Sequence, residues 1–471
     1  MYKFALAERA AFNGDVVTPA DADYADSISR WAVNAQRPAK VVAFVKDTSD
    51  IALALKYAKA HSLPIAIRGG GHSAAGSSSC ADGLIIDLSR YMNGVRIDAE
   101  KQVAYVGGGA LWEAVDKAAI QHGLATVAGT VNHTGVGGLL LGGGFGWLTA
   151  KHGLVIDNLL QATVVTADGS VLMTSSTENS ELFFAIRGGG CNFGVATEFV
   201  LKLHPQRRTV YAGMIYFHAD ALEKIIQATN TWYPNVGEKE GMIQIATVSP
   251  YGDPCVVLCV FYNGTEAKGR AAYKAFFDIG PVKDETREMP YEEVNSLQNA
   301  MAHHGQGVYM KGVAHRRPIY PSIAEAHAKV IDICKNTDFK ANILFEYFSL
   351  AKASAVPAGV TAFRRDITPA VVALILWKDD SPDNTSKAKQ MAHEITEIIT
   401  RSQEGVTETE CLGYSNYDFD AVAAGEEGPA KDKAKLVFGG NYPKLQQIKR
   451  RYDPSNIFNR WFPITPAAAA A

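Results

Sequence analysis

The 471-residue chain lacks several features that would place it in a class at once. It contains no uninterrupted apolar run of about 18 residues or more, so no transmembrane helix is expected. Its formal net charge of −3 gives no electrostatic basis for binding nucleic acid or an anionic membrane. The N-terminus lacks a basic stretch followed by a long apolar one, which favours an intracellular protein, or a secreted one if a signal was trimmed.

Cysteine is scarce and irregularly spaced. No two cysteines form a Cys-x-x-Cys pair, and the histidines are dispersed, so neither a disulfide framework nor a metal site is predicted. Buried free thiols are the simpler interpretation. The six cysteines are Cys80, Cys191, Cys255, Cys259, Cys334 and Cys411.

The composition that is present, with 47% hydrophobic and 20% charged residues, fits a globular protein, and the pattern of strands and helices along the chain indicates the α+β class. The length suits two domains packed together. Glycine-rich residues 1–205 and the closing residues 411–471 are predicted to form one domain. Residues 206–410 hold fewer glycines and alternate strand-like runs with amphipathic helices, which indicates an inserted domain built on an antiparallel sheet backed by helices.

Residues 41–72 illustrate the local pattern of the first zone. A β-branched run precedes an amphipathic helical stretch that Asp47 to Asp50 can cap, and a second apolar run leads into three glycines. The segment therefore predicts strand, helix, strand and glycine turn. Successive glycines permit positive φ and let backbone N–H groups approach an anion, so the turn indicates either a diphosphate site or only a tight turn. His72 follows directly, as a ligand or as a structural histidine.

Two further glycine clusters reinforce the first. Residues 129–149 contain eight glycines and almost no charge, too many for a stable helix or an ordinary strand. Residues 187–199 repeat the glycine turn before a strand. Close approach of the backbone to a planar, extended ligand explains all three clusters, whereas three unrelated turns would need three coincidences.

These motifs, in order, resemble the berberine bridge enzyme-like oxidases of the vanillyl-alcohol oxidase and p-cresol methylhydroxylase superfamily. The similarity rests on IRGGGHS, VGGGALW, GGGFGWLTAKHGLVIDNL and RGGGCNFGVATEF, and on YSNYDFD and NYPKLQQIKRRYDPSNIF near the C-terminus. It implies a two-part FAD-binding domain of the PCMH type and FAD joined covalently through the 8α-methyl to His72. The cofactor-binding positions it implies are Arg68, Gly69, Gly70, Gly71, His72, Ser73, Gly135, Gly138, Gly142, Gly143, Gly144, Asn158, Val195 and Asn441.

One departure from the family pattern is informative. Many members carry a second flavin bond from a cysteine, and the position matching that cysteine here is Val131. The resemblance therefore implies a single histidyl bond, the pattern of the 6-hydroxy-D-nicotine oxidase branch. Thr134 stands near the family position that gates oxygen and is small, which favours an oxidase over a dehydrogenase.

The family resemblance also implies a catalytic base in YSNYD. Tyr417 matches the family's basic tyrosine, Glu346 matches its acidic partner on a strand, and Tyr414 is a further catalytic candidate. In an extended segment Tyr414 and Asn416 would share a face and Tyr417 would point away, so a bulge or turn is needed to bring both tyrosines to the site. Glu346 interrupts an apolar run, where it lies at a cleft or faces solvent.

The expected activity is hydride transfer from a C–OH or C–N bond of a small substrate to flavin N5, with O₂ reoxidising the flavin to give hydrogen peroxide. A flavin dehydrogenase with another acceptor and a catalytically silent flavin-binding protein are the alternatives. The expected substrate is an alkaloid-like or other secondary metabolite, or a sugar, and the sequence does not distinguish among them. Aromatic residues compatible with either are Tyr309, Phe345, Tyr347 and Phe348. No feature of the sequence specifies an oligomeric state.

Overall fold

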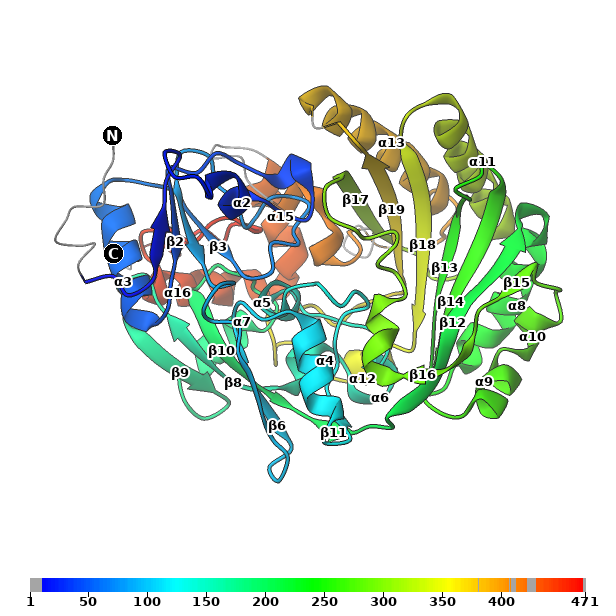
Figure 1. Cartoon of the computed structure of the whole chain (residues 1–471), viewed down its shortest axis with the longest axis horizontal. Helices are drawn as coiled ribbons and strands as arrows, with labels where there is room; N and C mark the ends of the chain where they lie inside the picture. Colours follow the sequence, from blue (N-terminus) through cyan, green and yellow to red (C-terminus); the bar gives the residue numbers. More distant parts are fainter. Residues whose placement is uncertain (1–10, 380, 406, 408–411, 422–428, 469–471) are drawn as a thin grey trace.

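The structure, a computed structural model, describes residues 11–379, 381–405, 407, 412–421 and 429–468. Its elements form two halves that lie side by side in Figure 1. Strands β1 to β11 occupy one half, and the large sheet formed by β12 to β19 occupies the other. Within the described residues, no helix is long and apolar enough to cross a membrane.

A small sheet begins the first half and has the strand order β1-β2-β4-β3. Its strands are β1 (Asp15–Val17), β2 (Val41–Phe44), β3 (Ile65–Arg68) and β4 (Leu84–Asp87), of which β2, β4 and β3 run parallel. Helix α3 (Thr48–Ala60) connects β2 to β3, and the Asp47 carboxylate caps it by accepting the N–H groups of Ser49 and Asp50. The predicted order of strand, helix, strand and glycine turn is confirmed.

A second, antiparallel sheet has the order β5-β6-β10-β8-β9. Its strands are β5 (Val95–Asp98), β6 (Val103–Gly107), β8 (Leu159–Val165), β9 (Val171–Ser175) and β10 (Val195–Lys202), and β7 (Leu124–Ala125) pairs with β11 (His204–Pro205) nearby. The helices of this half are α2 (Tyr24–Ile28), α4 (Trp112–Ile120), α5 (Val136–Leu141), α6 (Thr149–His152) and α7 (Ser180–Ile186).

Helix α5 corrects the sequence-based interpretation of residues 129–149, which excluded a stable helix. Its Val136 and Leu140 side chains are fully buried, and this packing compensates for the low helix propensity of Gly137 and Gly138. The remainder of the segment is mostly irregular, as expected, apart from the short helix α6.

The large sheet of the second half is antiparallel and has the order β15-β12-β14-β13-β18-β19-β17, with β16 also paired to β12. Its strands are β12 (Thr209–His218), β13 (Glu240–Val248), β14 (Pro254–Tyr262), β15 (Lys283–Asp284), β16 (Arg287–Pro290), β17 (Gly307–Ala314), β18 (Lys340–Phe348) and β19 (Ala370–Trp377). Helices α8 (Leu222–Trp232), α11 (Tyr320–Asn336) and α13 (Pro382–Thr400) pack on one face, while α9 (Glu266–Ala272), α10 (Lys274–Phe277) and α12 (Ala351–Ser354) are shorter. The predicted antiparallel sheet backed by helices is confirmed.

Strand β18 shows how this sheet separates a core from a site. Alternate side chains of a strand point to opposite faces. Ile343, Phe345 and Tyr347 pack in the core under the helices, whereas Leu344 and Glu346 face the other half of the molecule.

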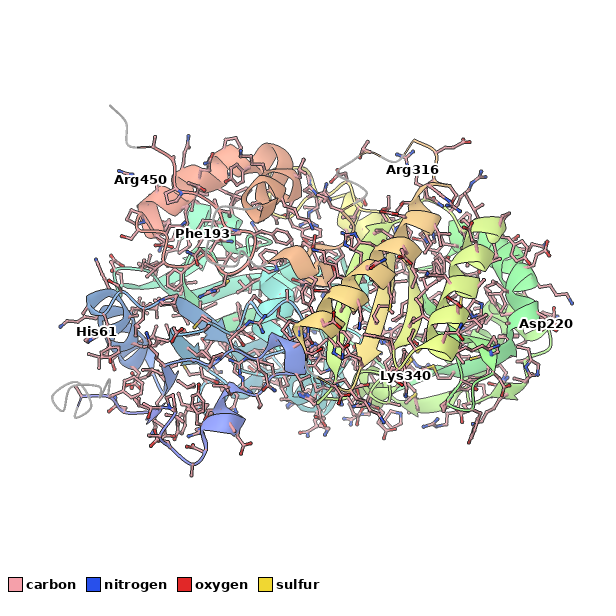
Figure 2. The ribbon with its side chains drawn as sticks, turned by 90° about the horizontal axis from the view of Figure 1, so that it is seen from above. His61, Phe193, Asp220, Arg316, Lys340 and Arg450 are labelled. Carbon is pink, nitrogen blue, oxygen red and sulfur yellow. The ribbon has the colours of Figure 1, made fainter. Side chains whose placement is uncertain are left out.

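The C-terminal segment returns to the first half with α15 (Pro429–Phe438) and α16 (Tyr442–Tyr452). The fully buried Lys449 ammonium donates to the Asn192 carbonyl (2.6 Å) and to the Asp453 carboxylate (2.7 Å). Figure 2 accordingly shows Arg450 and Phe193 near each other at the same end of the molecule. Segments that precede and follow the large sheet in the sequence thus build the first half together. The domain boundaries at residues 205 and 410 stay predictions.

Candidate active site

An elongated cavity lies between the glycine loops of the first half and the open face of the large sheet. The loop after β3 and helix α5 line one side, and strands β17, β18 and β19 line the other. The segment after Gly413 borders both. Of the expected site residues, those that line this cavity are Gly69, Gly70, Gly71, His72, Ser73, Gly135, Gly138, Gly142, Glu346, Tyr414 and Tyr417.

The glycine loops interlock through their backbones. A Cβ atom added to Gly70 would lie 2.6 Å from the Cα of Gly135, and one added to Gly69 would lie 2.8 Å from the Gly108 carbonyl. Gly71 has a φ of +69°, which favours glycine. At Gly138, by contrast, a Cβ would meet no atom of the part of the chain that the structure describes within 4 Å, and it would enter the cavity. Backbone therefore lines this wall, and a flat, extended cofactor such as FAD fits it.

His72 lies at the edge of this wall between two aromatic rings. The Trp31 ring stacks on the His72 ring with centroids 4.1 Å apart, and Nε2 of His72 lies 3.2 Å from Nδ1 of His133. Burial, with His133 and His304 nearby, lowers the pKa of His72 to about 3. The imidazole is therefore neutral near pH 7 and keeps a lone pair.

Glu346 and Tyr417 form a hydrogen-bonded pair at the sheet side of the cavity. The Tyr417 hydroxyl donates to Oε1 of Glu346 at 3.0 Å. Glu346 is only 4% exposed, which excludes the solvent-facing alternative, and its buried Oε2 has no hydrogen-bond partner among the described residues. Burial raises the pKa of Glu346 to about 8 and that of Tyr417 well above its usual value.

A turn brings both tyrosines to the cavity, as the sequence required. Residues Ser415–Tyr417 form one turn of 3₁₀ helix, in which the Tyr417 N–H donates to the Tyr414 carbonyl (2.9 Å). The Tyr414 hydroxyl accepts the Gly144 N–H (2.9 Å) and the amide N–H of Asn416 (2.7 Å). The Tyr414 side chain thus positions Asn416, which also lines the cavity.

Gly312 explains how this turn can lie so close to the sheet. A Cβ added to Gly312 on β17 would lie 3.1 Å from the Cβ of Tyr417, and one added to Gly413 would lie 2.8 Å from the Val313 nitrogen. Asp418 pairs with Lys311 in a short bridge between the turn and β17. Strand β17 was not anticipated, because its two glycines weaken the strand pattern.

Several expected cofactor residues do not line the cavity with their side chains. The Arg68 guanidinium binds the Asp87 carboxylate (3.0 Å) and the Ser27 carbonyl (3.1 Å). Gly143 and Gly144 lie behind the wall, where added Cβ atoms would strike Phe363 and Val155.

Three further expected positions are also engaged elsewhere. Asn158 pairs with His204 (2.7 Å) and donates to the Leu154 carbonyl (2.8 Å). Val195 is fully buried, although its neighbours Gly194 and Ala196 line the cavity. Asn441 donates to the carbonyls of Thr361 and Ala362, both at 3.2 Å.

Other cavity residues were not anticipated. Trp31 lines the cavity and stacks on His72, while His133 contacts His72 without lining the cavity; only the position of His133 within the glycine-rich run could have indicated it. Of the aromatic residues that the sequence made compatible with substrate stacking, Tyr309, Phe345 and Tyr347 lie in the core under the helices. Phe145 and Phe419 line the cavity instead.

The five described cysteines are free thiols: Cys80, Cys191, Cys255, Cys259 and Cys334. Cys191 lines the cavity beside Gly190, and burial raises the pKa of its thiol. Cys411 lies outside the described residues. Val131, at the position of the family's second tether, lines the cavity as well.

Comparison with known proteins points to flavoenzymes. Models described as FAD binding domain and as berberine and berberine like match residues 39–175 and 413–463. The FAD-linked oxidoreductase pgmH of Aspergillus terreus is 33% identical over 98% of this chain and 95% of its own length. The (R)-6-hydroxynicotine oxidase of Paenarthrobacter nicotinovorans is 29% identical over 98% of both chains.

Solved structures give the same answer. The crystal structure of 6-hydroxy-D-nicotine oxidase from Arthrobacter nicotinovorans superposes with a TM-score of 0.85 at 28% identity, covering 99% of this chain and 100% of the other. A berberine bridge enzyme-like protein of Physcomitrella patens has the same fold, with a TM-score of 0.82 at 20% identity over 98% of this chain and 99% of its own. The chain therefore belongs to the berberine bridge enzyme-like family and is an FAD-dependent oxidoreductase.

Proposed function

We propose that the protein binds a small organic substrate between the flavin and the large sheet, and removes a proton from its C–OH or C–N group through Glu346 and Tyr417. FAD, when bound, supplies the hydride acceptor at N5. The observation that carries the proposal is the 3.0 Å hydrogen bond between Tyr417 and Glu346, because both side chains line the cavity that the glycine loops also line.

The pair can move a proton in a defined direction. The raised pKa of Tyr417 means that its hydroxyl is not a base by itself. The Tyr417 hydroxyl can accept a substrate proton while its own proton passes to Oε1 of Glu346. Alternatively, Glu346 can accept directly at Oε2, which has no partner among the described residues. In both routes the Glu346 carboxylate is the final acceptor, and its raised pKa of about 8 makes it a stronger base than an ordinary glutamate.

We further propose that FAD is joined to His72 alone. His72 lines the cavity beside the glycine loop and is neutral near pH 7, as a nucleophilic imidazole must be. Val131 cannot form a second bond. The similarity to the (R)-6-hydroxynicotine oxidase of Paenarthrobacter nicotinovorans, at 29% identity, supports oxidation of a small molecule by this protein.

Dioxygen is the proposed electron acceptor, with hydrogen peroxide as the product. Thr134 lines the cavity, and its small side chain supports access of oxygen to this wall. The sheet side near Glu346 carries the apolar side chains of Met310, Leu344, Val372 and Leu374. This surface offers few partners to the hydroxyl groups of a sugar, so we propose an apolar or aromatic alcohol or amine as substrate.

Two measurements on the purified protein test the proposal. After acid precipitation, we expect the yellow colour to stay in the pellet and a flavin-bearing peptide to include His72, with His72→Ala as the control that releases all flavin. Substrate should bleach the flavin under nitrogen, and air should restore the colour. Bleaching that air does not reverse would indicate another acceptor. A protein inert to a panel of aromatic alcohols and amines would contradict the proposed chemistry.

A further inference from the structure

Three neighbouring histidines form a row from the cavity to the surface. His72 lines the cavity, its Nε2 lies 3.2 Å from Nδ1 of His133, and the His133 and His304 rings lie with their centroids 5.1 Å apart. His304 is exposed. The three residues come from three distant segments of the chain, so only the tertiary structure brings them together.

The position of the His72 ring is fixed on two sides. Trp31 stacks on its face at an interplanar angle of 13°, and the Trp31 indole N–H donates to the Ala302 carbonyl at 2.6 Å. The Trp31 N–H also donates to the Gly71 carbonyl at 3.2 Å. The ring can therefore neither tilt nor rotate freely, and its edge meets His133.

This geometry distinguishes the two nitrogens of His72. Neutral imidazole carries one N–H and one lone pair, and a hydrogen bond at one nitrogen decides which tautomer is present. Since Nε2 of His72 contacts His133, a proton on Nε2 can be donated to Nδ1 of His133. The lone pair then lies on Nδ1 of His72, whose ring lines the cavity.

We propose that His133 is the positioning residue of the flavin tether: it accepts the Nε2 proton of His72 and so makes Nδ1 the nucleophile toward the 8α-carbon. The inference rests on the proposed tether at His72. The ring of the exposed His304 lies next to that of His133.

The chemistry balances with dioxygen as the oxidant. A C–N bond forms between Nδ1 and the 8α-carbon, while one C–H bond of the 8α-methyl and the N–H bond of His72 break. The two electrons released reduce the flavin ring, and dioxygen then takes these electrons and two protons to give hydrogen peroxide. His133 acts on the N–H proton only.

The test is the rate at which flavin becomes acid-stable in the full-length protein incubated with excess FAD. Replacing His133 by leucine should slow tether formation by at least about tenfold, since it removes the acceptor. His133→Asn places an amide oxygen near the former Nδ1 and should restore most of the rate. His303→Leu, at an exposed histidine next to His304, is the matched control and should tether at the wild-type rate.

Total flavin bound before acid treatment and the Tm should stay near wild type in each variant, which separates tethering from folding. Equal rates in H133L and wild type would overturn the role of His133, as would an H133N protein as slow as H133L, or an equal loss in H303L. A wild-type protein that releases all its flavin in acid would instead overturn the tether itself, and with it this role.

Discussion

The cofactor end of the cavity is formed mainly by backbone, whereas the substrate end is formed by side chains. At the cofactor end, backbone from the short runs 69–73 and 135–142 forms the wall, and glycines let these runs touch. At the substrate end, Glu346 on β18 meets Tyr417 from a turn 71 residues later in the chain. The first end depends on the shape of the backbone and the second on the chemistry of a few side chains. Substitutions at the cofactor end should therefore change FAD binding, and substitutions at the substrate end should change the catalytic rate.

The largest effect is expected from Glu346→Gln. The amide keeps the shape of the side chain but cannot accept a proton as a base, so the rate of flavin reduction should fall by about 10³-fold. The matched control is Glu240→Gln on the neighbouring strand, where burial also raises the pKa of the carboxyl but the side chain binds Trp232 instead. Anaerobic stopped-flow absorbance measures both, and equal losses would contradict the assignment of Glu346.

Tyr417→Phe should have the next largest effect. It removes the hydroxyl that donates to Glu346, and we expect about a 10²-fold loss in kcat with FAD content unchanged. Tyr347→Phe is the control, because that hydroxyl is buried under the helices, without a hydrogen-bond partner among the described residues. A Y417F enzyme with wild-type kcat would place the base elsewhere.

The pH profile should show the ionisation of Glu346. The base must be deprotonated, and burial raises its pKa to about 8, so kcat/KM should rise by about tenfold per pH unit up to that value and then level off. Initial rates between pH 5 and 9 on a buffer series measure this. A profile that is flat across this range would refute Glu346 as the titrating base.

At the cofactor end, Gly138→Ala should weaken FAD binding by about tenfold without harming the fold. The added methyl meets no atom of the described residues within 4 Å, and alanine is a better helix former than glycine, so apoprotein Tm should be unchanged or higher. Gly94→Ala is the matched control, since a Cβ added there also meets no described atom within 4 Å, and Gly94 does not line the cavity. Flavin content after dialysis is the readout, and unchanged content in G138A would mean that FAD does not contact this wall.

The smallest effect concerns stability. The folded-state pKa of Glu346 lies above its unfolded value of about 4.5. The contribution of this residue to the free energy of unfolding is therefore fully present below pH 4.5 and is lost as pH rises through about 8. Glu346→Gln removes this loss of stability at high pH, because the amide does not ionise. The variant should therefore melt a few degrees above wild type at pH 8.5 and at the same temperature near pH 4. Thermal scans at both pH values measure the difference, and a shift in melting temperature of equal size at the two pH values would contradict this linkage.

The two ends also differ in how far the sequence predicted them. The loop from Gly69 to His72 was predicted because strand, glycines and histidine are consecutive. Glu346 and Tyr417 were proposed as a pair only through family resemblance, since no local pattern joins residues so far apart. Asn441 and Asn158 were assigned to the cofactor from their segments, yet their amides satisfy nearby backbone and histidine groups.

By itself the sequence determined the local elements: the strand and capped helix of residues 41–60, the glycine turns, the antiparallel sheet of the middle region and the need for a turn at residues 414–417. These follow from periodicity, capping and backbone freedom, which act over a few residues. The tertiary structure decided which face of β18 meets the cavity, that Glu346 is buried, and that Trp31 and His133 enclose His72. Burial and hydrogen bonding between distant segments set the pKa values there, and no local pattern encodes them.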